Sequence, residues 1–143
     1  MKKFMSLLSL LIFSIFLCSA TKLTVKKSRS LPKNQIVEIE VVINGKIVTS
    51  EKDIPYLMRM FKPGMFQLIT KDNPFTIKLK DSKSNTAKII VRTLILTKKG
   101  PKTQTKTVEL KNIKKNVIVT VNKNKKDNIK LTVSGKCNVK FVK

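Results

Sequence analysis

The sequence has no histidine and no tryptophan, and it has one tyrosine, two cysteines and four isolated glycines in 143 residues. The absence of histidine excludes Ser-His-Asp and Cys-His nucleophile systems, histidine acid–base catalysis and most zinc sites. Isolated glycines cannot build a phosphate-binding loop, and few aromatic rings are available for stacking sugars or single-stranded bases. We therefore expect a protein that is not an enzyme and has no metal or cofactor site.

Acidic residues are scarce as well. The sequence has eight Asp and Glu but 31 Lys and Arg, which gives a formal net charge of +23. Glu38 and Glu40 would point the same way from one strand, which is an arrangement that a carboxylate-only glycosidase could use. We expect instead a solvated strand face on which these carboxylates offset nearby lysines.

The positive charge is almost entirely lysine, because the only arginines are Arg29, Arg59 and Arg92. Lysine is a hydrated point charge, whereas arginine suits bidentate recognition, so this excess favours diffuse attraction to anions. A genome bias towards Lys, Asn and Ile codons is the alternative explanation. The candidate anion-binding residues are Lys26, Lys27, Arg29, Lys78, Lys80, Lys123, Lys125 and Lys126.

The first twenty residues have the three parts of an export signal. Lys2 and Lys3 precede an apolar run over residues 4–17, and the small residues Cys18 and Ala20 follow it. The run is shorter than the ~20 residues that span a bilayer. The pattern predicts cleavage after Ala20 and an exported protein, either secreted or in the periplasm and cell envelope. An uncleaved membrane anchor is the alternative.

The two cysteines predict no internal disulfide, because cleavage after Ala20 leaves Cys137 alone. Cys137 would then be a half-buried strand residue or form an intermolecular disulfide. Lipid attachment at Cys18 is a further alternative, although Leu17 is not the small residue that bacterial lipoprotein signals place before the cysteine.

Apolar and polar residues alternate with period two through most of residues 35–143, which is typical of half-buried strands. Asn44-Gly45 predicts a hairpin with a type I′ turn, and Gly100-Pro101 predicts a second turn within residues 98–102, after the long apolar segment 86–97. About eight or nine strands at this spacing predict an all-β, mainly antiparallel sandwich or barrel-like fold.

Residues 51–61 have a different pattern. Ser50 can cap a helix and Pro55 fits its first turn, so we expect one short helix near 51–61. The predicted organisation is a signal peptide over 1–20, a basic arm or first strand over 21–34 and a single β-rich domain over 35–143.

Together these features predict an exported, non-catalytic binding module that holds an anionic envelope or surface component, or an acidic protein partner, through a lysine-rich face. Nucleic acid fits the charge but not the location. Membrane association through a lipid on Cys18 or through surface charge stays open, as does the oligomeric state. The alternative function is a structural or assembly component of an envelope or secretion apparatus. In size and layout the predicted domain resembles the small periplasmic β-sandwich lipoproteins of type VI secretion, which implies binding through loops or a sheet edge.

Overall fold

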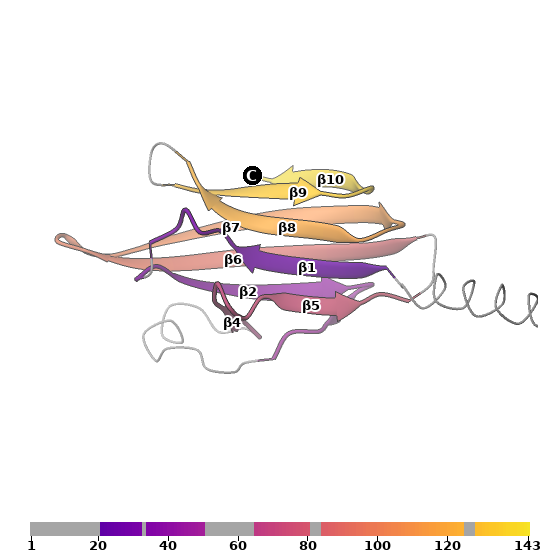
Figure 1. The fold of residues 1–143 in the computed structure, drawn as a ribbon, viewed down its shortest axis with the longest axis horizontal. Coiled ribbons are helices and arrows are strands. Elements are labelled where there is room, and N and C mark those ends of the chain that lie inside the picture. Colours follow the sequence, from indigo (N-terminus) through magenta and orange to yellow (C-terminus); the bar gives the residue numbers. More distant parts are fainter. Residues whose placement is uncertain (1–20, 33, 51–64, 81–83, 125–127) are drawn as a thin grey trace, which may run out of the picture.

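The computed structural model describes residues 21–32, 34–50, 65–80, 84–124 and 128–143 (Figure 1). Within these ranges the chain forms ten strands in two sheets and no helix, which confirms the all-β prediction. The strands are β1 (Lys22–Lys27), β2 (Ile36–Ile43), β3 (Lys46–Ile47), β4 (Gln67–Ile69), β5 (Phe75–Lys78), β6 (Asn85–Thr97), β7 (Gly100–Ile113), β8 (Val117–Lys123), β9 (Ile129–Ser134) and β10 (Asn138–Val142). The count exceeds the predicted eight or nine because the segment 21–34, for which the sequence left a basic arm or a first strand open, contains β1.

Two predicted features lie outside the described residues, namely the export signal at 1–20 and the short helix near 51–61. In the part of the chain that is described, no helix is long and apolar enough to cross a bilayer.

The strands pack as a two-layer sandwich. Sheet A has the order β5-β1-β8-β9, and sheet B has the order β10-β7-β6-β2-β3, with β4 also paired to β2. Every pairing is antiparallel except that of β1 with β8. Figure 1 shows sheet A lying in front of sheet B. Because β1 sits between β5 and β8, the basic segment after residue 20 contributes a central strand of sheet A.

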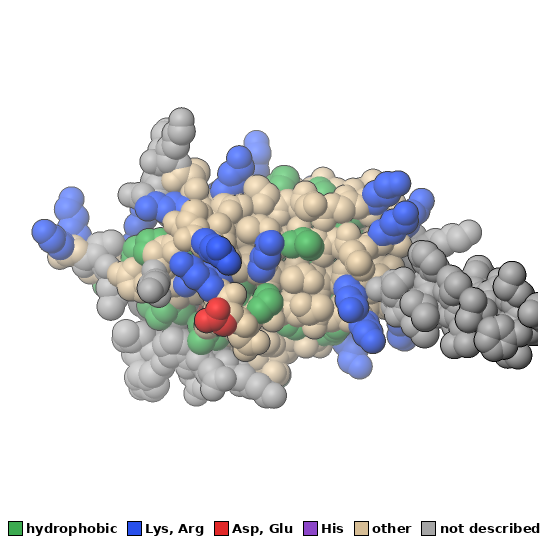
Figure 2. All heavy atoms as spheres, in the orientation of Figure 1, with side chains coloured by type: hydrophobic (Ala, Val, Ile, Leu, Met, Phe, Trp, Pro, Cys, Tyr) green, Lys and Arg blue, Asp and Glu red, His purple; other side chains and the backbone are tan. Residues whose placement is uncertain are grey.

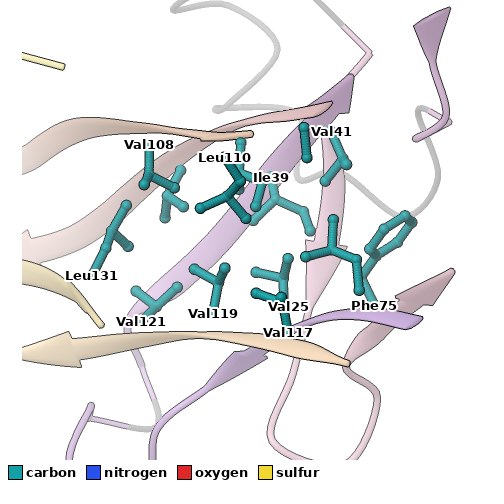
Figure 3. Packing of buried hydrophobic residues seen from close by; sticks show 14 of the residues in the cluster. Val25, Ile39, Val41, Phe75, Val108, Leu110, Val117, Val119, Val121 and Leu131 are labelled. Atoms are coloured by element: carbon teal, nitrogen blue, oxygen red, sulfur yellow. The ribbon is translucent and has the colours of Figure 1, made fainter. Parts of the chain in front are cut away.

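The core lies between the sheets and follows the period-two alternation. Val25 of β1, Ile39 of β2, Leu110 of β7 and Val119 of β8 are all fully buried there. Figure 3 shows side chains from both sheets meeting in this layer. Burial of each such side chain stabilises the fold by about 1.5–3 kcal/mol, so the alternation specifies which face of each strand turns inward.

The hairpin predicted at Asn44-Gly45 is confirmed. Ile43 pairs with Lys46, and the φ angles of Asn44 and Gly45 are 50° and 82°, as a type I′ turn requires. The Asn44 side-chain oxygen also accepts a hydrogen bond from the backbone N–H of Thr86 at 2.8 Å. The turn is thereby tied to the start of β6.

The turn predicted within residues 98–102 is confirmed, but the Gly100-Pro101 pair that indicated it does not form the turn itself. The turn lies at Lys98-Lys99, and Pro101 already belongs to β7, opposite Leu96 of β6. Proline is tolerated there because β10 covers β7 only from Thr107 onward, so Pro101 lies on a free edge where no donor is needed.

The outer face of sheet B is also partly buried, which the sequence did not predict for Glu38. The Glu38 carboxylate is fully buried and accepts a hydrogen bond from Nε of Arg92, its direct neighbour on β6. The Arg92 guanidinium lies 4.0 Å from the ring centre of Phe66, which is itself buried. Glu40, the other carboxylate of β2, is partly exposed. Its carboxylate accepts a hydrogen bond from the backbone N–H of Met65 at 3.1 Å. The expectation of a solvated carboxylate face is therefore wrong, because Phe66 and β4 pack beside this part of the sheet.

Candidate anion-binding site

A cationic hollow lies at the end of β1. The residues that line it are Lys26, Lys27, Ser28, Arg29, Lys71, Asp72, Pro74 and Thr120, and its volume is about 680 Å³. Four cations therefore surround the hollow with one carboxylate. The hollow can attract an anionic group by charge, and two hydroxyl-bearing residues line it as further hydrogen-bond donors.

Two ordered turns build the hollow. After β1 the Ser28 N–H donates to the Val121 carbonyl at 3.0 Å, and the buried Leu31 anchors the following loop. On the other side, Thr70 and Asn73 exchange backbone hydrogen bonds and hold Lys71 and Asp72 between them. The two turns also meet directly, because Nζ of Lys71 lies 3.4 Å from the Arg29 carbonyl oxygen.

Lys27 is the electrostatically perturbed member of the hollow. Its pKa is lowered from 10.5, first by desolvation and second by the charge of Lys71. Because the unfolded chain binds more protons than the folded chain between the lowered pKa and 10.5, this group makes stability rise with pH across that window. A bound anion would favour the charged form and raise the pKa of Lys27 again.

The hollow opens onto the outer face of sheet A, which we call the lysine–threonine face. Strand registers place Lys22 beside Lys78 and Lys26 beside Thr120 on this face. The members of the face are Lys22, Thr24, Lys26, Thr76, Lys78, Thr120, Lys130 and Thr132. The four strands of sheet A, all of them within the described ranges, contain no Asp or Glu. Figure 2 shows Lys and Arg side chains spread over this side of the molecule, with little acidic surface among them.

Sheet B balances its charges differently. On its outer face Glu109 of β7 lies directly between Lys88 of β6 and Lys140 of β10. Opposite charges across strands attract, whereas the like charges of Lys22 and Lys78 on sheet A repel. The strands of sheet A therefore carry their lysines without any carboxylate, whereas Glu38, Glu40 and Glu109 offset part of the positive charge of sheet B.

The structure divides the predicted anion-binding residues into groups. Lys26, Lys27 and Arg29 meet in the hollow. Lys123 is the last residue of β8. It follows Val121, which pairs with Lys27, so it lies toward the same end of sheet A as the hollow. Lys78 and Lys80 lie near the opposite end, around Lys22, and both are exposed. Lys125 and Lys126 lie outside the described residues.

Sequence reasoning missed Lys71, Lys22 and Lys130. Lys71 lines the hollow together with Arg29, although the two are 42 residues apart in the sequence, so no local pattern connects them. The alternation of β9 does carry a signal for Lys130, which lies between the buried Ile129 and Leu131, and Lys22 is the polar residue directly before the buried Leu23.

Of the two cysteines, Cys18 lies outside the described residues. Cys137 is half-buried, as expected, but it lies in the turn between β9 and β10 and not in a strand. It packs against the core, and burial raises the pKa of its thiol, which lowers the thiolate fraction available for disulfide exchange.

Comparison with known protein families, curated proteins and solved structures found no match for this chain. Among the residues that the structure describes, no three His, Cys, Asp or Glu side chains gather as a metal site would require.

Proposed function

We propose that this protein is an exported, non-catalytic binding module that holds an anionic partner through its lysine–threonine face and the adjoining cationic hollow. The observation that carries the proposal is the absence of any carboxylate from the four strands of sheet A, beside lysines that the strand registers place next to one another. The partner is an acidic protein or an anionic surface component outside the cytoplasm.

The shape of the face supports this kind of partner. The lysines lie on a nearly continuous strand surface and present point charges without an arginine fork, which suits an extended array of anionic groups more than one small anion. The repulsion between Lys22 and Lys78 would be relieved by an anion placed over them.

Neutralising the face should weaken binding to heparin and to anionic vesicles. Each lysine near an anionic surface contributes about 1 kcal/mol, so removing four should reduce affinity by at least about tenfold even after screening. The measurement is vesicle co-sedimentation and heparin elution at increasing salt. The test variant is K22Q/K26Q/K78Q/K130Q.

A matched control removes the same charge from sheet B, where Glu109 already offsets part of it. This control should change affinity by less than about threefold. Equal losses in both variants would show that only net charge matters and would contradict a specific face. Binding of the native protein that persists above about 0.3 M salt would support close contact, since the Debye length is then about 6 Å. The control variant is K46Q/K88Q/K111Q/K140Q.

The export part of the proposal rests on residues 1–20 and predicts a mature chain that begins at Thr21. Mass spectrometry of the protein recovered from its native compartment should show this N-terminus. Diacylglycerol on Cys18 would favour instead the second candidate function, a structural component of an envelope or secretion assembly. An intact Met1 in the cytosol would contradict export altogether.

A further inference from the structure

The C-terminal strand β10 leaves one edge of sheet B open. It pairs with β7 on one side and ends the sheet on the other. Val139, Phe141 and Val142 are 40%, 56% and 40% exposed, and they are half of the exposed large apolar residues in the described part of the chain. An apolar edge strand with unpaired backbone groups is a template for a further strand.

The exposure of Phe141 follows from the strand register. Val139 and Phe141 lie opposite Leu110 and Val108, so they point to the same side of sheet B as the core. They are nevertheless about half exposed, because sheet A ends at β9. β10 thus presents a core-type face that no other described strand covers.

A groove runs beside β10 along the open side of the sandwich. It has a volume of about 370 Å³ and is lined on one side by Ile129 and Leu131 of β9 and on the other by Phe141. Figure 1 shows β9 and β10 together at this margin of the molecule. Lys106, Lys130 and Lys143 also line the groove, and none of its described lining residues is acidic.

We propose that an acidic protein partner adds an extended segment to the free edge of β10. Backbone hydrogen bonds to β10 would supply affinity, and alternate side chains would supply specificity. Residues on one side of the added strand would fill the groove against Phe141 and Leu131. Residues on the other side would lie beside Lys140, so the segment recognised is one in which apolar and acidic residues alternate. The inference rests on the proposed function, since it takes the partner to be acidic.

The positive charge of the chain argues against a second copy of this chain as the partner that pairs with β10. Each chain carries a formal net charge of +23. An antiparallel pair of two β10 strands would bring the Lys140 side chains and the lysine-lined ends of both grooves together. Like charges placed across strands are destabilising, whereas glutamate or aspartate at the same positions would attract.

The test uses the purified protein and a labelled peptide of about eight residues in which valine and glutamate alternate, a length that matches an ordinary strand. We expect this peptide to bind and to slow amide hydrogen exchange across β10. Phe141→Asn should weaken binding by at least about tenfold, as expected for an apolar anchor. Ile47→Asn, which changes an exposed apolar residue on β3 at the opposite edge of sheet B, should change it by less than about twofold. Polyglutamate of equal charge should bind without protecting β10.

The outcomes separate the two proposals. If both peptides bind equally and Phe141→Asn has no effect, strand addition at β10 is overturned while anion binding stands. If neither peptide binds at about 0.15 M salt, the proposed function fails as well. A third outcome is that Phe141→Asn weakens binding of the alternating peptide while K22Q/K26Q/K78Q/K130Q binds polyglutamate as tightly as the native protein does. This outcome would support strand addition at β10 and would contradict anion binding by the lysine–threonine face. Self-association in sedimentation that is lost in Phe141→Asn would identify a second copy as the occupant and overturn the acidic partner.

Discussion

Replacing Arg92 with methionine should lower the free energy of unfolding by about 3–5 kcal/mol, because the change leaves the buried Glu38 carboxylate without its cation. Glu38→Leu should cost a similar amount, since it leaves the Arg92 guanidinium buried and uncompensated. The Arg92 change also removes the contact with Phe66, which contributes up to about 2 kcal/mol when a cation is desolvated.

The double variant Glu38→Leu/Arg92→Met should recover most of this loss. Taking two charges out of water costs about as much as their attraction returns, so an apolar pair of similar size comes within about 1 kcal/mol of the native stability or exceeds it. Urea unfolding at neutral pH measures all four members of the cycle. Single changes that cost less than about 1 kcal/mol would mean that the pair behaves as an exposed ion pair and that the packing beside it is loose.

Gly135→Ala should destabilise the protein by about 2–5 kcal/mol through backbone strain and a steric clash. Gly135 has a φ of 132° in the turn between β9 and β10. A Cβ there would lie 2.6 Å from the Asn116 carbonyl oxygen and 2.9 Å from Cγ2 of Val117. Because Val117 is fully buried in β8, neither neighbour can move without disturbing the core.

Gly45→Ala is the matched control for this change. Gly45 also has a positive φ, at 82°, but nothing lies within 4 Å of a Cβ built on it. Only the conformational cost remains, which is about 1–2 kcal/mol. Thermal unfolding of both variants compares the two turns directly. Equal losses would indicate that the chain near Gly135 moves to accommodate the methyl group.

Local patterns predicted those parts of the fold that depend on neighbouring residues. Alternation over 35–43 placed Ile39 in the core, and Asn44-Gly45 specified a hairpin, because both effects act within a few residues. The turn within residues 98–102 was predicted as well, but Pro101 lies in β7 and not in the turn, although proline normally marks a turn. Its tolerance in β7 depends on how far β10 extends along the partner strand.

The candidate site was predictable only in part for the same reason. The run Lys26, Lys27 and Arg29 is visible in the sequence, but Lys71 joins it through a contact between two separate turns. Glu38 was expected to be solvated because it occupies a polar position of its strand. Its partner Arg92 lies 54 residues away, and Phe66 packs above that partner.

The sequence by itself determined that this is a lysine-rich chain of half-buried strands that contains no histidine. The tertiary structure decided which lysines share a face, that Glu38 is buried against Arg92, and that Phe141 points to the core side of a sheet without being covered. Alternation is a relation between residues two apart and is fixed by the geometry of one strand. Which strands become neighbours, and where a sheet ends, depends on contacts between distant segments that compete for the same buried area.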